Sequence, residues 1–273
     1  MAPRVPPPPI ITLLTDFGLR DVYVGIMKGV ILGFSPHARL VDLGHEIPPQ
    51  DILAGALALK FAWRYFPPGT VHLAVVDPGV GSSRRGLAAS ILGHFFVGPD
   101  NGLFSLIFQD QEPGAVVSLE NFHYFLPQVS ATFHGRDIFA PVAAHLSLRT
   151  PLTDLGPELA DPVKLDIPSP RFQDTEVFGQ VIYCDHFGNL ISNIPFASFN
   201  SWLQDRSVQI QVDGCPVTHL GITYSDAPPG ALLALAGSHG YLEIASRQGS
   251  AAQILGAGPG ASVQICLNPT FER

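Results

Sequence analysis

The sequence predicts an α/β N-terminal domain with a mostly parallel sheet, followed by a smaller, barrel-like all-β C-terminal domain. Up to about residue 148, apolar strand-like segments alternate with helical ones, which is typical of a covered parallel sheet. From about residue 173, short strand-like segments follow one another between Gly and Pro turns. The 27 glycines and 26 prolines indicate many sharp turns, and the 46% apolar content is enough to form buried cores.

The first half contains three predicted strands, each rich in apolar residues. They cover residues 10–14, 40–43 and 70–76. The predicted helices cover residues 22–34, 51–66 and 137–148. The second helix is the clearest, because Asp51 is a suitable N-cap and Pro67 and Pro68 stop the helix.

The second half contains only strand candidates, and we expect no helix among them. The candidates cover residues 176–184, 207–212, 231–236, 241–245 and 262–267. A linker is expected at 161–174, where three prolines occur, and residues 1–9 are expected to form a disordered Pro-rich tail. The predicted domains are therefore 10–160 (α/β) and 175–273 (all-β).

Composition excludes several classes of protein. The net charge of −8, without a basic run, argues against nucleic-acid binding, which needs a basic face against the phosphates. The N-terminus lacks the features of a signal peptide, and the apolar runs are too short to span a bilayer. The three cysteines form no CxxC pair, so we expect reduced, buried thiols in a cytoplasmic protein.

Two of the predicted strands end in a carboxylate, where ligands collect in open α/β sheets. Asp16 follows the first strand and Asp77 the third, and each is soon followed by a glycine. A single aspartate here often does no more than cap a turn, but two strands that end alike favour a site. The glycines after Asp77 lack the spacing of a phosphate loop, and neither a helical HExxH motif nor a Gly-x-Ser-x-Gly elbow is present.

Two further turns combine side chains that are useful for chemistry. His134 stands at the head of a predicted helix, where an imidazole tends to stay neutral. Asp185, Phe187 and Asn189 bring a carboxylate, an aromatic ring and an amide together within five residues, a combination suited to a purine and a cation. Each group can equally be an ordinary capping or turn sequence.

Six motifs in order give the chain a family resemblance. They are Leu14-Thr15-Asp16-Phe17-Gly18, His45-Glu46-Ile47-Pro48-Pro49-Gln50-Asp51, Val76-Asp77-Pro78-Gly79-Val80-Gly81, Gly98-Pro99-Asp100-Asn101-Gly102, His134-Gly135-Arg136-Asp137 and Phe187-Gly188-Asn189-Leu190. From about residue 10 to residue 266 the chain resembles the S-adenosylmethionine hydroxide adenosyltransferases, the adenosine-forming S-adenosylmethionine hydrolases related to fluorinase and chlorinase.

The resemblance implies hydrolysis of S-adenosylmethionine to adenosine and L-methionine without a metal or redox cofactor. It also implies a homotrimer whose sites lie between the N-domain of one subunit and the C-domain of the next. The family's Asp, Arg and His match Asp77, Arg84 and His134, although Arg85 competes with its neighbour for the arginine position. The substrate-binding positions of the family match Asp16 (ribose), Asp21, Asp185 and Ser238 (methionine), and Phe187 and Asn189 (adenine).

Two positions bear on how far the resemblance extends. Fluorinase has Tyr where this chain has Asp77, and a carboxylate there suits water better than a halide. Where hydrolases of the family usually show an Asn, this chain has Gly237, followed by Ser238 and His239, which puts the methionine-end contacts in doubt. A protein that only binds adenosine or S-adenosylmethionine, a 5′-halogenating relative and a metal-dependent phosphohydrolase remain as alternatives.

Overall fold

The computed structural model describes residues 7–204 and 206–268, which belong to two compact units with the boundary between Leu165 and Asp166. Most of the tail predicted at 1–9 lies outside the described residues; Pro9 leads directly into the first strand, and its carbonyl accepts a hydrogen bond from Arg39 N at 2.8 Å. Each unit has its own hydrophobic core. Among the described residues, no helix has both the length and the apolar character that crossing a membrane would require.

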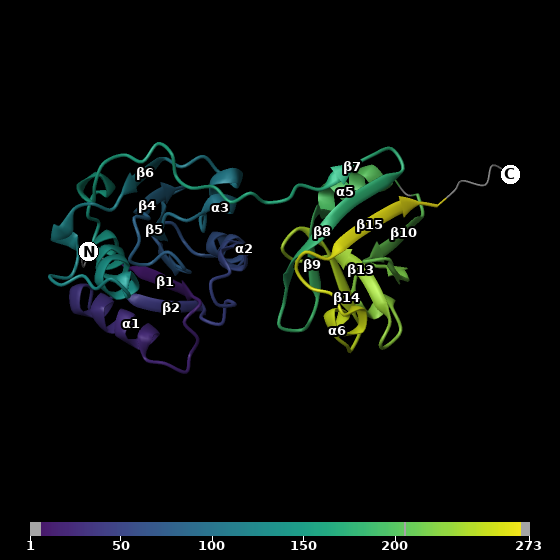
Figure 1. Cartoon of the computed structure of the whole chain (residues 1–273), viewed down its shortest axis with the longest axis horizontal. Coiled ribbons are helices and arrows are strands. Elements are labelled where there is room, and N and C mark those ends of the chain that lie inside the picture. Colours follow the sequence, from purple (N-terminus) through teal and green to yellow (C-terminus); the bar gives the residue numbers. More distant parts are fainter. Residues whose placement is uncertain (1–6, 205, 269–273) are drawn as a thin grey trace, which may run out of the picture. The chain divides into compact units, whose positions relative to one another are not determined.

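The first unit contains a six-stranded sheet with the order β2-β1-β3-β5-β4-β6 (Figure 1). Its strands are β1 (Ile10–Thr15), β2 (Arg39–Gly44), β3 (Val71–Val75), β4 (Gly86–Ile91), β5 (His94–Pro99) and β6 (Ala115–Ser118). The first four strands in the order run parallel, and β4 and β6 pair antiparallel with their neighbours. The predicted α/β fold with a mostly parallel sheet is confirmed, although the sequence identified only β1, β2 and β3.

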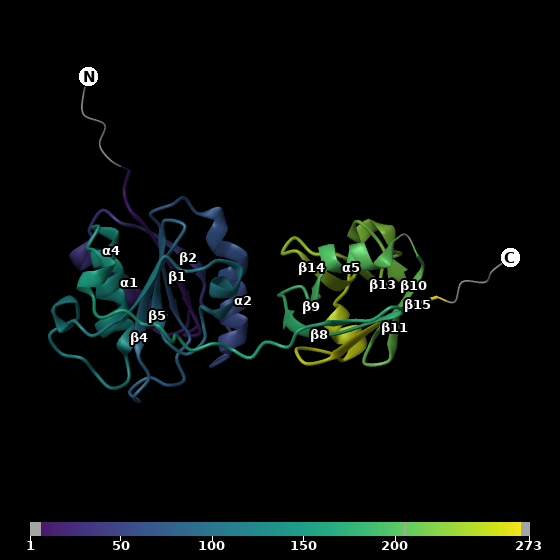
Figure 2. The ribbon, with the colours of Figure 1, turned by 90° about the horizontal axis from the view of Figure 1, so that it is seen from above.

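Helices cover both faces of this sheet, with α1 and α4 on one face and α2 on the other (Figure 2). Their bounds are α1 (Tyr23–Phe34), α2 (Ile52–Ala62), α3 (Ser105–Asp110) and α4 (Ala140–Ser147). As predicted, Asp51 caps α2, and its Oδ1 accepts a hydrogen bond from Ala54 N at 2.9 Å. The predicted helix 51–66 ends earlier, because the chain tightens into a 3₁₀ turn at Trp63–Tyr65. A π-helical turn, Gly135–Phe139, precedes α4.

Strand β1 fixes the position of the loop that follows it, because it is buried on both faces. Ile11 and Leu13 pack against Met27 and Ile31 of α1 in the larger core cluster, and all four side chains are fully buried. Burial of one such side chain contributes about 1.5–3 kcal/mol. The buried strand therefore fixes the position at which the loop after Thr15 begins.

The second unit consists of nine strands with the order β11-β10-β15-β8-β9-β14-β13-β12, with β7 paired to β8. The bounds are β7 (Arg171–Phe172), β8 (Glu176–Cys184), β9 (Leu190–Pro195), β10 (Val208–Val212), β11 (Cys215–Val217), β12 (His219–Leu220), β13 (Leu232–Ala236), β14 (Tyr241–Ser246) and β15 (Ser262–Leu267). Strands β11 and β12 lie at opposite ends of the order yet are joined by Thr218 alone. The two edges must therefore meet, and the predicted barrel-like all-β domain is confirmed.

Two expectations for the second half are wrong. The unit contains helices α5 (Phe196–Leu203) and α6 (Ala251–Leu255), where no helix was expected. Both are too short for a helical hydrophobic period to stand out; α5 is anchored by the buried side chain of Phe199, and α6 begins at a Ser250 cap. All three cysteines are free, but none is fully buried: Cys184 and Cys266 are half-buried, and Cys215 is exposed on β11.

Candidate active site

The two carboxylates that follow predicted strands lie at the same edge of the first sheet. Strands β1 and β3 are parallel neighbours, and Thr15 pairs with Val75 at their carboxyl ends. Asp16 follows directly and Asp77 two residues later, so both are carried by the loops where open α/β sheets collect ligands.

Asp77, Arg84 and His134 form one hydrogen-bonded cluster. Arg84 Nε donates to Asp77 Oδ1 at 2.8 Å, and Arg84 Nη2 donates to Asp77 Oδ2. The same Nη2 lies 3.0 Å from His134 Nδ1, and the guanidinium stacks on the Phe139 ring. The side chains of Arg84 and Asp77 are only 10% and 5% exposed, so the ion pair is poorly hydrated. Bidentate arginine–carboxylate pairs of this kind are strong and directional.

Gly81 allows the turns that carry Asp77 and His134 to approach each other. Its backbone is left-handed (φ 77°), and a Cβ there would stand 2.2 Å from the Ala131 carbonyl oxygen. No side chain fits at that distance, so the contact requires glycine. The turn after β3 is therefore packed directly against the segment that leads to His134.

The hydrogen bonds determine the proton arrangement on His134. An arginine only donates, so His134 Nδ1 must be the acceptor and the proton of a neutral ring sits on Nε2. Burial, together with the charge of Arg84, lowers the pKa of His134. The ring is therefore neutral at neutral pH and presents an Nε2–H donor.

Arg85, the other candidate for the arginine of the site, binds two carboxylates outside the Asp77–Arg84–His134 cluster. It binds the buried Asp100 at 2.7 Å and Asp161 at 2.8 Å, and these two carboxylates raise its pKa. Next to Asp100, Asn101 Nδ2 donates to the Val76 carbonyl at 2.8 Å, one residue before Asp77. Arg84, not Arg85, contacts Asp77 and His134.

The other two candidates in this unit stand in the loop after β1. Asp16 Oδ2 accepts a hydrogen bond from Gln50 N at 2.8 Å, which fixes its carboxylate at the edge of the sheet. Asp21 is exposed five residues further along, just before α1. The exposed position of Asp21 leaves it open to a ligand or to another chain.

In the second unit, Asp185, Phe187 and Asn189 form the turn between β8 and β9. Asp185 Oδ1 accepts from Phe187 N and Asn189 N, and its Oδ2 accepts from Asn189 Nδ2 at 2.9 Å. Asn189 is nearly buried, whereas the Phe187 ring is 74% exposed. Phe187 and Asn189 line an open pocket of about 560 Å³ together with Tyr224 and Arg247.

Ser238 is exposed in the turn between β13 and β14, where the sequence departs from the family pattern. The His239 ring lies over Gly237, so a Cβ at Gly237 would stand 2.2 Å from His239 Cε1. His239 Nε2 lies 3.2 Å from the buried carboxylate of Glu243, and Nδ1 accepts from Tyr241 N at 3.4 Å. Gly237 and His239 thus form one local unit, in which the imidazole is turned toward Glu243.

Sequence reasoning missed Tyr224, Arg247 and Glu243. Tyr224 OH donates to Glu243 Oε1 at 2.7 Å, and burial, together with Glu243, raises the pKa of Tyr224 to about 12. These residues lie in separate turns and in the middle of β14, and no short motif marks them. Tyr224 and Arg247 come to the Phe187 pocket only in the folded unit, and Glu243 stands behind Tyr224.

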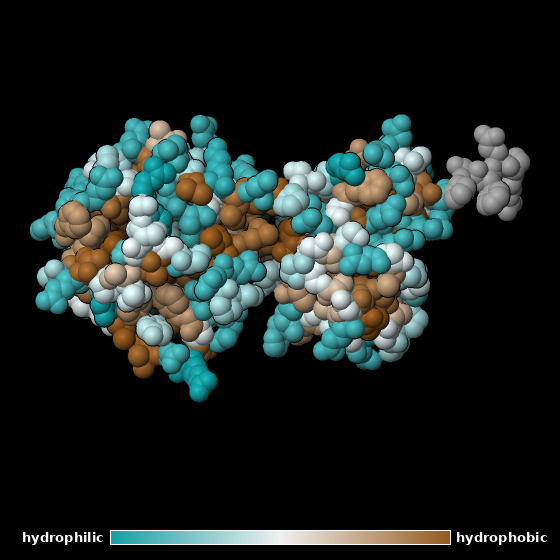
Figure 3. Space-filling view, viewed as in Figure 1, coloured by the Kyte–Doolittle hydropathy of each residue, from teal (hydrophilic) through white to brown (hydrophobic). Residues whose placement is uncertain are grey.

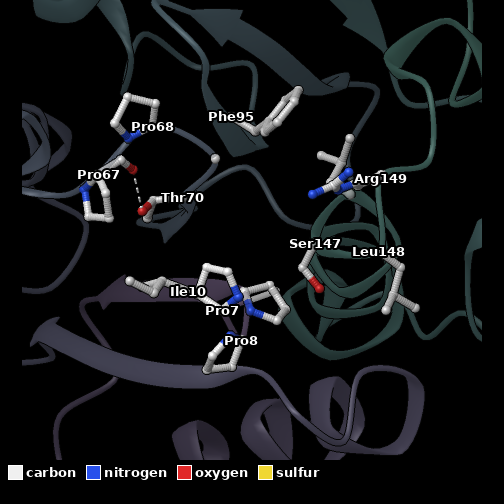
Figure 4. Close-up of a pocket in the computed structure, with 13 residues that line it drawn as sticks. Pro7, Pro8, Ile10, Pro67, Pro68, Thr70, Phe95, Ser147, Leu148 and Arg149 are labelled. Atoms are coloured by element: carbon white, nitrogen blue, oxygen red, sulfur yellow. Dashed lines mark hydrogen bonds between the residues drawn. The ribbon is translucent and has the colours of Figure 1, made fainter. Parts of the chain in front are cut away.

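A larger pocket of about 630 Å³ lies at the opposite edge of the first sheet, where β1, β3 and β5 begin (Figure 4). Proline and apolar side chains dominate its lining; Thr70 donates to the Pro67 carbonyl, and Arg149 is its one titratable side chain among the described residues. Among the described residues that line it there is no carboxylate, histidine, cysteine or lysine. No group of three or more His, Cys, Asp and Glu side chains in the described parts of the chain is arranged to hold a metal ion.

The chain is similar to known proteins over most of its length. Residues 11–156 match the family model "SAM hydroxide adenosyltransferase N-terminal domain", and residues 179–264 match the corresponding C-terminal domain. An (R)-S-adenosyl-L-methionine hydrolase from Salinispora arenicola is 39% identical, over 94% of this chain and 97% of its own. A fluorinase from Nocardia brasiliensis is 28% identical, over 94% and 96%. The crystal structure of an uncharacterized conserved protein from Thermotoga maritima has a TM-score of 0.89 and 37% identity, and covers 94% of this chain and 99% of its own.

Proposed function

Because this chain belongs to the SAM hydroxide adenosyltransferase family, we propose that it hydrolyses S-adenosyl-L-methionine to adenosine and L-methionine. The observation that carries the proposal is the cluster of Asp77, Arg84 and His134 at the carboxyl edge of the parallel sheet. A curated relative that is 39% identical over nearly the whole chain bears the name of this activity.

The reaction is a nucleophilic substitution at the ribose C5′ carbon. Water forms a bond to C5′ while the C5′–sulfur bond breaks, and the electron pair goes to sulfur, so methionine leaves as a neutral thioether. No general acid is required, because the sulfonium is already a good leaving group. The protein has to align the water opposite sulfur and take up its proton, and alignment alone can supply several kcal/mol.

Asp77 is the proton acceptor that the cluster provides. His134 Nδ1 is occupied by Arg84 and Nε2 carries a proton, so the neutral imidazole orients the water rather than deprotonating it. Both oxygens of Asp77 accept from Arg84 but keep a second lone pair for the water. The two-pronged contact with the guanidinium fixes the direction of the carboxylate.

The remaining candidates suit the three parts of the substrate. Asp16 is proposed to bind the ribose hydroxyls, and its fixed carboxylate at the edge of the sheet supports this role. Phe187 and Asn189 are proposed to bind adenine, and the pocket that they line with Tyr224 supplies aromatic surface for a purine. The exposed Asp21 and Ser238, together with Asp185, are proposed to bind methionine.

The alternatives fit less well. A protein that only binds the nucleoside has no use for the Asp77–Arg84–His134 cluster. A halogenating enzyme would place a halide beside the Asp77 carboxylate, where like charges repel.

We further propose that the reaction needs no metal or cofactor, since the substrate carries its own leaving group. We also propose that the protein is cytoplasmic, which its three free thiols support.

We also propose a homotrimer in which the N-domain of one subunit and the C-domain of the next share a site. An exposed apolar patch supports self-association (Figure 3 shows apolar side chains at the surface over α1). Leu19, Val22, Tyr23 and Ile26, in and just before α1, are exposed, and they are close in sequence to Asp16 and Asp21. Inactive Asp16→Ala and Asn189→Ala variants should regain part of the activity when they are dissociated, mixed and reassembled. Reassembled trimers without activity would contradict a shared site.

Reaction in ¹⁸O-water tests the activity itself. One heavy oxygen is expected at the 5′ position of adenosine, and the Asp77→Asn variant should lose roughly 10²–10⁴ in kcat, as is usual for a general base. The substitution is nearly isosteric, so binding of S-adenosylmethionine should change far less. Adenosine without the label, or an Asp77→Asn variant of near wild-type rate, would overturn the mechanism.

A further inference from the structure

Residues 45–50 belong to a sequence motif that has no part in the proposed chemistry. They are hydrogen-bonded to the loop that carries Asp16. Four hydrogen bonds join the two segments. They run between Thr15 Oγ1 and His45 Nδ1 (2.9 Å), Gly18 N and His45 O (2.7 Å), Leu19 N and Glu46 Oε1 (3.1 Å), and Gln50 N and Asp16 Oδ2 (2.8 Å). The last of these bonds reaches the Asp16 carboxylate itself.

The His45 ring lies between the Thr15 hydroxyl on one side and the Asp42 carboxylate on the other. Phe17 N donates to Thr15 Oγ1 at 3.2 Å, so the Thr15 hydroxyl is free to donate its own proton to His45 Nδ1. On its other side, His45 Nε2 lies 3.1 Å from Asp42 Oδ1, within ion-pair distance but without a well-aligned hydrogen bond. Lys28 Nζ binds the other oxygen of Asp42 at 2.6 Å. The series of contacts ends at the backbone of the residue after Asp16.

Burial makes these contacts hard to replace with water. Thr15 is fully buried and the His45 side chain is 2% exposed. Removal of the imidazole leaves the Thr15 hydroxyl without its acceptor in a dry site, which is costly. Phe17 N, immediately after Asp16, donates to that hydroxyl and then loses the support that orients it, whereas Gly18 N keeps its bond to the main-chain oxygen of residue 45.

We infer that His45 is a positioning residue that fixes the direction of the Asp16 carboxylate toward the ribose diol of the substrate. The inference rests on the proposed function, since it assigns Asp16 to the ribose. The His45 side chain acts through Thr15 and the backbone of residue 17. Its loss should therefore weaken binding of the diol and leave the Asp77 chemistry largely intact.

The experiment measures the dissociation constants of adenosine and of 2′,3′-dideoxyadenosine by calorimetry, with kcat and KM for S-adenosylmethionine alongside. The wild type is expected to prefer adenosine, and His45→Ala should reduce this preference roughly tenfold and raise KM to match, with kcat within about threefold. His45→Asn, whose amide oxygen can accept from Thr15 in place of Nδ1, should restore most of the preference. Asp42→Ala, a change at a more exposed side chain, should give a smaller loss without endangering the fold.

His72→Asn is the matched control. His72 is also a buried histidine bonded to a threonine of β1, with its Nδ1 2.8 Å from Thr12 Oγ1, but it lies away from the Asp16 loop. It should lower stability and leave the preference for the diol unchanged. In an Asp16→Ala background, His45→Ala should have no further effect on that preference, because the group through which it acts is gone.

Three outcomes in the variants would overturn the inference. The first is an unchanged preference for adenosine in both His45→Ala and Asp42→Ala. The second is that His45→Ala reduces this preference as much in the Asp16→Ala background as in the wild type. The third is that His72→Asn reduces the preference as much as His45→Ala does. A wild type that binds the two nucleosides equally would also overturn it, since Asp16 would then not hold the diol. A wild type that prefers adenosine but does not hydrolyse S-adenosylmethionine would refute the proposed function and leave the positioning role of His45 standing.

Discussion

Acid is expected to destabilise the α/β unit through a histidine pair in its core. His72 on β3 is fully buried; its Nε2 lies 3.2 Å from His94 Nδ1, and the two rings stack. Burial, together with the neighbouring His94, lowers the pKa of His72 to about 3. An unfolded histidine has a pKa near 6.5, so the unfolded state binds the extra proton first as the pH falls.

The sign and the size follow from that difference. A depressed folded-state pKa contributes stability that is present above pH 6.5 and is lost as the pH falls toward 3. Each pH unit in this window is worth about 1.4 kcal/mol, so His72 alone should lower the free energy of unfolding by about 2 kcal/mol between pH 7.5 and pH 5. Burial also lowers the pKa of His94, which adds to the loss in the same direction.

Urea unfolding at both pH values, at one protein concentration, provides the measurement. The chain has two tryptophans, and Trp202→Phe leaves Trp63, which contacts His94, to report on the α/β unit alone. In that background, His72→Asn keeps an acceptor for Thr12 but cannot titrate. Its unfolding free energy should fall by about 2 kcal/mol less than that of its parent over the same pH range. Equal losses in the two proteins would refute the assignment to His72.

Two further predictions concern the candidate active site. Burial and the charge of Arg84 lower the pKa of His134, so kcat should stay level as the pH falls through 6.5 and decline only at lower pH. The Arg84→Gln variant, which lacks that charge, should show the decline at higher pH. An unchanged pH profile in this variant would contradict the role of Arg84. The two arginines should also differ: Arg84→Met is expected to lower kcat by roughly tenfold or more, whereas Arg85→Met should mainly reduce thermal stability by freeing the buried Asp100. Similar kcat values for the two variants would show that the contacts with Asp77 and His134 do not matter for turnover.

The sequence by itself carried the fold class and the chemistry-bearing motifs. Strands β1 and β3, the Asp51 cap and the polar residues at strand ends are local features, in which a few neighbouring side chains determine the backbone. The sequence did not predict strands β4 to β6. β4 and β5 form an antiparallel pair, and a short apolar run of this kind cannot be told from a buried helix by its periodicity. The short helices α5 and α6 escaped for a related reason, since each depends on the buried side chain or cap that anchors it.

Tertiary structure decided which of the marked residues act together. Two adjacent arginines are equivalent in sequence, and only the approach of the turn at Gly81 to Ala131 directs Arg84 to Asp77 and His134 while Arg85 binds Asp100. The link from His45 to the residue before Asp16 likewise joins positions thirty residues apart. A local motif determines a residue's type and its turn, but the direction of a side chain is set by contacts between distant segments, and these exist only once the sheet has formed.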